Sequence, residues 1–465
     1  MSPPQSEDSR NSKVFSSRSD ESKNGQIKVK PLPERKFEVR ESLLTELFKN
    51  PHIKTVQHIF AASLVGLMVN TVAQDYHKNG EIRFGFHLIA KSFGKIELVV
   101  GIWLLLNFLA IVSYGNFKLW ANFRRNLQPK DVAFKILDYT FLSLLVGYYI
   151  LSFKSIAILV EYFDLPIGSS AIVCLEHTRI VMKIHAFMRS NAPKVLKFKT
   201  HSDQKLNIAN LTHFIYFLFA PTLVYRDQYP RSKTIRWNFI LERSAEIIGV
   251  IFYYAFLVEK FMIQPYQHIG LKRFTASQII LSICENSACG LLCLLCGFYV
   301  VLHSVQNLVG ELLRFGDRMF YKDWWTSTNY PEYFRTWNVV VYDWLYTYIY
   351  KDIYEFLVPG NKSVAKFAVF VISAIVHEWV LTYMFHFFFP ALFMVFLFSG
   401  TVMTFFRTPK LDIINVIFWY FLAFGSGLLT SLYSMEYFVR INVPVENHTL
   451  WEVFVPRLFT CDCIG

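Results

Sequence analysis

The chain alternates between long apolar stretches and shorter polar segments. The stretches lie at about residues 55–73, 96–114, 132–152, 155–175, 243–262, 277–303, 366–389, 391–406 and 412–434. A helix needs roughly 20 predominantly apolar residues to cross the hydrocarbon core of a bilayer, and most of the stretches approach this length. The pattern therefore predicts an all-α polytopic membrane protein with about nine transmembrane helices.

The fourth stretch, residues 155–175, gives the weakest signal of the nine. Glu161, Asp164 and Pro166 interrupt it. Charged side chains are costly in hydrocarbon, and a proline removes a backbone hydrogen bond from a helix. We therefore expect this stretch to be a broken or re-entrant helix.

The first 40 residues differ from the rest of the chain. They are rich in Ser, Lys, Arg, Asp and Glu, and they contain few large apolar residues. Such a composition cannot bury enough apolar surface to fold, and no stretch in it resembles a secretory signal. We expect residues 1–40 to form a disordered cytosolic tail and residues 41–465 to form one membrane domain.

Composition agrees with the membrane assignment. Hydrophobic residues make up 53% of the 465 residues, and the mean hydropathy is +0.31. The formal net charge of +12 is spread over several loops. This distribution favours a membrane surface and an anionic substrate over nucleic acid. The segment 177–236 is strongly basic, and the positive-inside rule places it in the cytosol.

His377 and Glu378 lie in the middle of the apolar stretch 366–389. A charged side chain there costs roughly 2.5 to 3.5 kcal/mol. Ser373 lies four residues earlier and shares a helix face with His377. Apolar surroundings favour the neutral imidazole that a general base needs. From this residue alone, a histidine that binds a neighbouring helix or lines an ion path is an equally good explanation. We expect His386, on the same helix, to be structural.

The polar loop at about residues 303–367 interleaves aromatic and basic side chains. An amphipathic segment at the membrane interface would have this composition. A site for a substrate with a flat ring system, several phosphates and an apolar tail would have it too, and an acyl-coenzyme A thioester is such a substrate. The basic members are Arg314, Arg318, Lys322, Arg335, Lys351 and Lys362.

Two runs in this loop resemble the signature block of the sterol O-acyltransferases, in the membrane-bound O-acyltransferase superfamily. They are Arg-Phe-Gly-Asp-Arg-Met-Phe-Tyr-Lys-Asp-Trp-Trp, which starts at Arg314, and Arg-Thr-Trp-Asn-Val-Val-Val-Tyr-Asp-Trp-Leu-Tyr, which starts at Arg335. Supporting matches lie at residues 179–183, at 219–231 and at the Val-His-Glu segment around His377. The resemblance extends from about residue 175 to the end of the chain.

The resemblance implies an enzyme of the endoplasmic reticulum membrane that transfers a long-chain fatty acyl group from acyl-coenzyme A to a sterol hydroxyl and so forms a storage ester. It implies a homo-oligomer in a lipid bilayer. Acyl-coenzyme A is then a co-substrate and no cofactor is required. No metal is needed either, because a thioester is already activated.

The resemblance also assigns roles to individual residues. His377 corresponds to the catalytic histidine and Asn338 to the second catalytic polar residue, at the expected separation of 377 − 338 = 39 residues. His377 would take the proton of the sterol hydroxyl, and Asn338 would donate a hydrogen bond to the thioester or its developing oxyanion, or orient the base. The residues implied to contact acyl-coenzyme A are Arg335, Trp337, Tyr342, Tyr350, Lys362 and Ser373.

Two positions depart from the family pattern. Thr326 stands where the family has asparagine after Asp-Trp-Trp, and Tyr342 stands where it has histidine. Because Asn338 and His377 are retained, we expect activity, while the acyl and acceptor preferences stay open.

Two other functions compete with sterol esterification. Acylation of diacylglycerol or of a long-chain alcohol would use the same chemistry, although the signature text is closer to the sterol branch. A transporter with His377 on a proton path is a remote alternative. Such a protein would be expected to show repeat symmetry, and none is evident.

Overall fold

The structure is a computed structural model that describes residues 20–21, 27–28, 31–80, 82, 84–126, 132–197, 208–401, 409, 411–444 and 455–461. Nearly all regular structure in these ranges is helical. The strands among the described residues are β1 (Asp20–Glu21) and β2 (Ile27–Lys28), which pair antiparallel. The predicted all-α fold class is confirmed.

The elements are defined here in chain order. The α-helices are α1 (Leu43–Leu47), α2 (Pro51–Asn79), α3 (Phe86–Ser92), α4 (Ile96–Asn126), α5 (Val132–Tyr162), α6 (Ile167–Lys197), α7 (Leu211–Phe219), α8 (Trp237–Val258), α9 (Gln264–Tyr266), α10 (Ala276–Glu285), α11 (Ser287–Gly297), α12 (Gln306–Leu312), α13 (Tyr330–Trp337), α14 (Val339–Leu345), α15 (Lys362–Phe385), α16 (Ala391–Thr401) and α17 (Asp412–Asn442). The π-helical turns are η2 (Glu259–Ile263), η3 (Phe298–Val305), η5 (Tyr346–Tyr350) and η6 (Ile353–Leu357), and the 3-10 turns are η4 (Trp324–Thr326) and η7 (Arg457–Phe459).

Six helices in the described part of the chain are long and apolar enough to cross a membrane. They are Pro51–Lys78, Ile96–Asn126, Val132–Tyr162, Ser287–Leu312, Lys362–Phe385 and Asp412–Asn442. Each overlaps a predicted stretch, which confirms a multi-pass membrane protein, although the stretch 277–303 is divided at Asn286 between α10 and α11. Of the remaining predicted stretches, 243–262 lies on α8 and η2, and 391–406 begins on the short helix α16.

The fourth predicted stretch is not a single helix. Its first half is the end of α5, and its second half is the start of α6. Between them Asp164 adopts the left-handed conformation with φ 41°, and Pro166 directly precedes α6. The chain therefore turns at the polar residues that weakened the prediction, because a left-handed residue cannot continue a right-handed helix.

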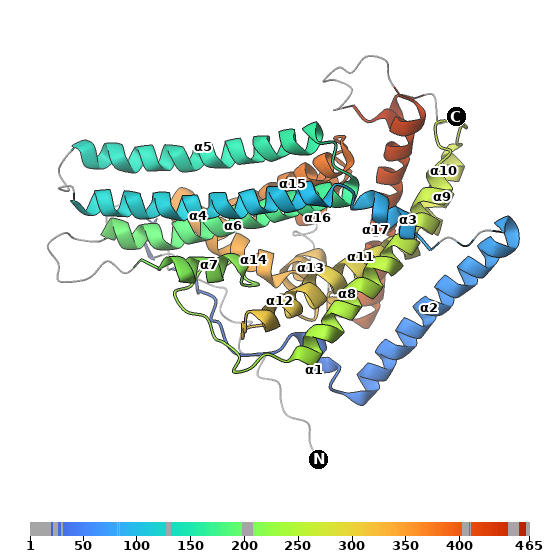
Figure 1. The fold of residues 1–465 in the computed structure, drawn as a ribbon, viewed down its shortest axis with the longest axis horizontal. Coiled ribbons are helices and arrows are strands. Elements are labelled where there is room, and N and C mark those ends of the chain that lie inside the picture. The colour runs from blue at the N-terminus through green and yellow to red at the C-terminus, as the bar shows by residue number, and fades with distance from the viewer. Residues whose placement is uncertain are drawn as a thin grey trace.

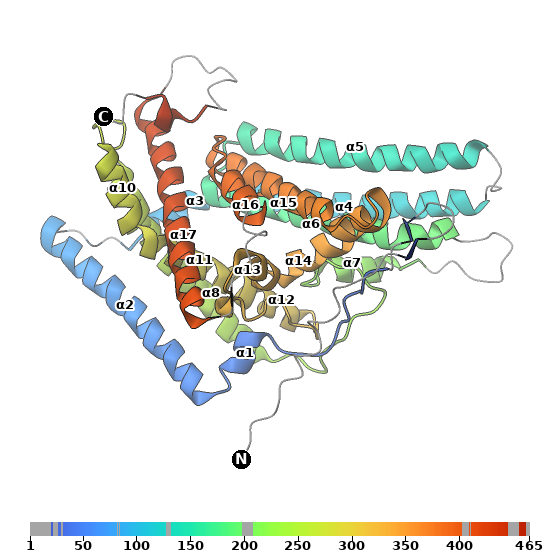
Figure 2. The same ribbon diagram turned by 180° about the vertical axis from the view of Figure 1, so that it is seen from behind.

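Most of the long helices pack together, and one long helix stands apart from them. In Figure 1, α4, α5 and α6 run alongside one another as long helices, whereas α2 stands apart at the opposite edge. Seen from behind in Figure 2, α15 and α16 lie against this group, and α13 and α14 lie next to them. Helix α15 packs on α6 and α16 and on the turns η5 and η6. The two predicted catalytic residues thus lie in the region where α13, α14, α15 and α16 come together.

The last part of the predicted tail lies against the membrane domain. Arg40 donates two hydrogen bonds to the Asp317 carboxylate, at 2.8 and 2.9 Å, and its backbone N–H donates to Gly316 O at 2.9 Å. The Phe37 ring packs edge-on against Tyr229, with the centroids 5.4 Å apart. Residues 31–40 are therefore attached to the signature block. Most of the earlier residues of the predicted tail lie outside the described ranges.

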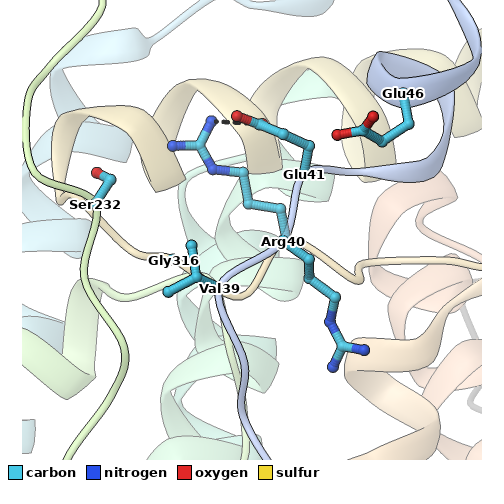
Figure 3. Close-up of a pocket in the computed structure, with 7 residues that line it drawn as sticks. Val39, Arg40, Glu41, Glu46, Ser232 and Gly316 are labelled. Atoms are coloured by element: carbon cyan, nitrogen blue, oxygen red, sulfur yellow. Dashed lines mark hydrogen bonds and ion pairs between the residues drawn. The ribbon is translucent and has the colours of Figure 1, made fainter.

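A small polar pocket adjoins this attached segment. It has a volume of about 280 Å³. Figure 3 shows Glu41 and Ser232 on opposite sides of the pocket. Glu41 forms an ion pair with Arg318, with 3.4 Å between the charged atoms. Of the charged groups of the pocket, Glu41 pairs with Arg318 inside the pocket, whereas Arg40 and Glu46 pair with Asp317 and Lys49 outside it.

Candidate active site

His377 lies in the middle of α15, a helix with well-defined ends. Asn361 caps its start by accepting a hydrogen bond from Val364 N at 3.1 Å, and the helix ends at His386, which has φ 60°. The His386 ring contacts the Glu161 carboxylate at 3.2 Å and Leu165 O at 2.9 Å. These contacts attach the end of α15 to the turn between α5 and α6, which agrees with the structural role expected for His386.

The ring of His377 is oriented by its own helix. Nδ1 lies 2.7 Å from the carbonyl oxygen of Ser373 and 3.5 Å from the Ser373 hydroxyl oxygen. A carbonyl oxygen can only accept a hydrogen bond, so Nδ1 carries the proton and Nε2 of the neutral ring keeps its lone pair. The predicted shared face is confirmed, but the shorter contact is to the main chain rather than to the hydroxyl.

The His377 side chain is packed on one side and exposed on another. Its imidazole lies deep among protein atoms and yet keeps exposed surface. The face of the ring stacks on Phe396 of α16, with centroids 4.7 Å apart and an interplanar angle of 29°. The ring is thus held on one face and still reachable by a substrate.

Asn338 lies at the junction of two helices. It follows α13 and caps α14 with φ −133° and ψ 85°, and its Oδ1 accepts a hydrogen bond from Val341 N at 3.1 Å. Capping of this kind satisfies one of the backbone donors at the start of a helix. Because Oδ1 is used in this way, the Nδ2 group is the part of the amide that remains to donate a hydrogen bond.

A chain of aromatic rings connects the two catalytic candidates. Phe396 packs against His377 on one side, and its ring centroid lies 5.3 Å from that of Phe334 on α13. Phe334 lies one helical turn before Asn338. Helix α16 therefore spans from the histidine to the helix that ends at the asparagine.

Tyr342 and Tyr350 belong to a ladder of stacked tyrosine rings. Tyr342 stacks on Tyr346, Tyr346 on Tyr350 and Tyr350 on Tyr354, with centroid distances of 6.2, 5.6 and 5.9 Å and interplanar angles of 17°, 14° and 6°. The ladder begins four residues after Asn338. Tyr346 and Tyr354 were not predicted as site residues, although a tyrosine at every fourth position from 342 to 354 is visible in the sequence.

The other predicted contact residues are spread around these elements. Arg335 is exposed and lies 3.9 Å from the Glu332 carboxylate, and Lys362 is the first residue of α15. Trp337 packs into an aromatic cluster, 4.6 Å from Trp324 and 5.0 Å from Phe298 between ring centroids. Trp337 therefore packs against η3 and η4.

The two departures from the family pattern have local explanations. The Thr326 hydroxyl donates to Asp323 O at 2.8 Å and so closes its own 3-10 turn. Tyr342 forms the first rung of the tyrosine ladder. Among the described hydrogen bonds and ring contacts, neither side chain has one with His377.

Comparison with known proteins places these observations in a wider context. Residues 100–435 match the model of the membrane-bound O-acyltransferase family. The chain is 37% identical to sterol O-acyltransferase 1 of Mus musculus over 446 residues, which cover 94% of this chain and 81% of the relative. It is 38% identical to sterol O-acyltransferase 1 of Chlorocebus aethiops, covering 94% and 79%, and 32% identical to sterol O-acyltransferase 2 of Homo sapiens, covering 91% and 80%.

Proposed function

This chain belongs to the membrane-bound O-acyltransferase family, and from that premise we propose that it transfers a long-chain fatty acyl group from acyl-coenzyme A to the hydroxyl of a sterol. The observation that carries this proposal is similarity to sterol O-acyltransferases over almost the whole chain, together with a family match over residues 100–435, a range in which both candidate catalytic residues lie. The product is a sterol ester, which is suited to storage because it lacks the free hydroxyl.

His377 acts as the general base. Its Nε2 accepts the proton of the sterol hydroxyl while the sterol oxygen attacks the carbonyl carbon of the thioester. The tetrahedral intermediate then expels coenzyme A thiolate, which receives the proton from the imidazolium. The hydrogen bond from Nδ1 to Ser373 O supports this role because it keeps Nε2 unprotonated. General-base catalysis typically contributes about 10²- to 10⁴-fold in rate.

Asn338 stabilises the developing oxyanion. Its Oδ1 is occupied by the α14 cap, so Nδ2 is the group that remains to donate a hydrogen bond. The cap fixes the amide plane before substrate arrives, and preorganised donors of this kind are worth about 10²- to 10³-fold in kcat. Of the two roles that the sequence left open for Asn338, this geometry favours donation to the thioester.

Acyl-coenzyme A binds along the tyrosine ladder and the adjoining cations. Tyr342 and Tyr350 present stacked ring edges that lead away from Asn338. Arg335 and Lys362 bind phosphates of coenzyme A, because guanidinium and ammonium groups form strong charge-assisted hydrogen bonds with phosphate. Ser373 and Trp337 complete the predicted contact set. The enzyme operates as a homo-oligomer in the endoplasmic reticulum membrane, with the coenzyme A end of the site facing the cytosol.

An acceptor panel tests the proposal. Purified protein in lipid nanodiscs receives labelled oleoyl-coenzyme A with cholesterol, diacylglycerol or a long-chain alcohol. We expect cholesteryl ester as the main product, and we expect His377→Ala and Asn338→Ala to abolish it while the proteins keep their size-exclusion profile. Preferential acylation of diacylglycerol would replace the proposed acceptor, and full activity of His377→Ala would exclude this histidine as the base.

A further inference from the structure

Glu378, the neighbour of His377, is a buried carboxylate that holds the start of another helix. Only 4% of the residue is exposed. Its Oε2 accepts a hydrogen bond from Phe393 N, in the first turn of α16, at 3.1 Å. The first backbone N–H groups of a helix have no partner within the helix, and a carboxylate at that end is favourable. Glu378 thus fastens the start of α16 to the middle of α15.

Tyr433 of α17 braces the same turn. Its hydroxyl donates to Phe389 O at 2.8 Å and accepts from Leu392 N at 3.3 Å. The hydroxyl oxygen also lies 3.4 Å from both carboxylate oxygens of Glu378. The hydrogen-bond partners of the Glu378 carboxylate among the described residues therefore belong to α16, to α17 and, through the Phe389 backbone, to the turn before α16. The imidazole beside it in the sequence is not one of them.

One helical turn after Phe393, α16 contacts the ring of His377. Phe396 follows Phe393 by three residues and stacks on the His377 ring. The Ser373 carbonyl holds one point of the ring, Nδ1, so a second contact is needed to fix the ring plane. Phe396 supplies that contact, and its position depends on where α16 begins.

We propose that Glu378 is a positioning residue for His377: by holding the first turn of α16, it keeps Phe396 stacked on the imidazole and fixes the direction of Nε2 toward the substrate. This inference rests on the proposed function, in which His377 is the base. A misplacement of a reacting group by about 1 Å can cost about 100-fold in rate. Loss of Glu378 should therefore lower kcat and leave the KM values for both substrates unchanged.

The chain contains a matched control carboxylate. Glu436 of α17 is fully buried, and it accepts hydrogen bonds from Arg457 N and Leu458 N, both at 2.8 Å, at the start of η7. It holds the start of a helical turn as Glu378 does, but it also pairs with Arg440 at 2.6 Å, and its turn stacks Phe459 on Phe389 rather than on His377 or Phe396. Loss of Glu436 therefore measures the effect of removing a buried helix-capping carboxylate that does not hold Phe396, together with the loss of one ion pair.

The kinetic test compares wild type with Glu378→Ala, Glu378→Gln, Phe396→Leu, the double variant Glu378→Ala/Phe396→Leu, and Glu436→Ala. We expect Glu378→Ala to lower kcat by about 10-fold or more while each KM stays within about twofold. Glu378→Gln retains most of kcat, because its amide oxygen still accepts from Phe393 N. Phe396→Leu reproduces the loss, and the double variant is no worse than the poorer single variant. Losses that multiply in the double variant, or an equal kcat loss in Glu436→Ala, would overturn the inference.

An NMR measurement tests the position of the His377 ring without relying on which alcohol the enzyme acylates. The imidazole C–H resonances of ¹³C-labelled histidine report the ring current of Phe396, and His377→Ala assigns the His377 signal. Glu378→Ala and Phe396→Leu should shift this signal in the same direction, whereas Glu378→Gln and Glu436→Ala should leave it in place. An unshifted signal in Glu378→Ala overturns the inference even when the wild type esterifies sterol. Absence of acyl transfer by wild type would refute the proposed function alone.

Discussion

Gly290 of α11 and Gly427 of α17 pack backbone against backbone. A Cβ atom added to Gly290 would lie 2.5 Å from Gly427 N, and one added to Gly427 would lie 2.5 Å from the Cα of Ser287. Small residues allow helices in membranes to approach this closely, and the close approach strengthens van der Waals packing. The crossing of α11 and α17 thus depends on both glycines.

Gly290→Ala should destabilise the protein. The added methyl group meets backbone atoms that cannot move aside, and overpacking of this kind typically costs about 1 to 3 kcal/mol. Thermal unfolding in nanodiscs measures the change. Gly297→Ala, also on α11, is the matched control because a Cβ there meets open space. An equal loss of stability in both variants would contradict the close crossing.

Ser373→Ala should separate the main-chain role of residue 373 from its side-chain role. The carbonyl that holds Nδ1 of His377 is unchanged by this substitution, so kcat should stay within about threefold of wild type. KM for oleoyl-coenzyme A should rise, because the hydroxyl is a proposed contact of acyl-coenzyme A. Steady-state kinetics with each substrate varied in turn gives both constants. A large loss of kcat at unchanged KM would show that the hydroxyl itself orients the base.

Asn338→Asp should fold normally and lose activity. A carboxylate oxygen can still accept from Val341 N and cap α14, but it cannot donate a hydrogen bond to an oxyanion. We expect kcat to fall by about 100-fold or more, in line with loss of a preorganised donor. The unfolding temperature should stay close to that of wild type while kcat falls. Retained kcat would mean that Asn338 acts through the cap alone.

Tyr346→Ala should weaken acyl-coenzyme A binding. Tyr346 lies in the middle of the ladder, and its removal leaves a gap between Tyr342 and Tyr350. Loss of one stacked aromatic contact is worth about 1 kcal/mol or more, so KM for oleoyl-coenzyme A should rise about fivefold. KM for sterol should be unchanged. Tyr420→Ala, an exposed residue on α17, is the control; an equal rise there would argue against a specific role of the ladder.

Asp317 should make folding stability depend on pH. Burial alone would raise its pKa, but hydrogen bonds from Arg40 and the charge of Arg35 bring the pKa below its usual value. Burial lowers the pKa of Arg35, whereas the hydrogen bond to Asp317 raises the pKa of Arg40. The pair with Arg40 is therefore the main source of the stabilisation. A carboxyl with a lowered folded pKa stabilises the fold above its unfolded pKa of about 4, and this contribution is lost as pH falls toward the folded pKa.

Asp317→Asn tests this dependence. The variant leaves Arg40 without its carboxylate, whereas Arg35 keeps its ion pair with Asp343, and the loss should cost roughly 3 kcal/mol at neutral pH. The difference in unfolding temperature between wild type and variant should shrink as pH falls below about 4. Lys49→Gln, which removes an exposed ion pair with Glu46, is the control. A difference that stays constant with pH would show that the Asp317 carboxylate does not supply the stabilisation.

The sequence by itself determined the fold class and the local geometry around His377. Apolar stretches near bilayer length predicted spanning helices, because hydrocarbon offers no partner to an unpaired backbone group. The spacing of Ser373 and His377 predicted a shared helix face, since helical periodicity is a local property. Resemblance to a family supplied the chemistry, and similarity across almost the whole chain supports it.

Only the tertiary structure decided which side chains meet. The stack of Phe396 on His377, the bond from Phe393 to Glu378 and the ion pair of Arg40 with Asp317 join different elements, and the last pair is 277 residues apart. In a membrane protein, lipid and protein interior are both apolar, so hydrophobic pattern cannot tell which face of a helix packs inward. Close backbone approach and buried polar pairs select one packing, and these depend on the folded positions of whole helices.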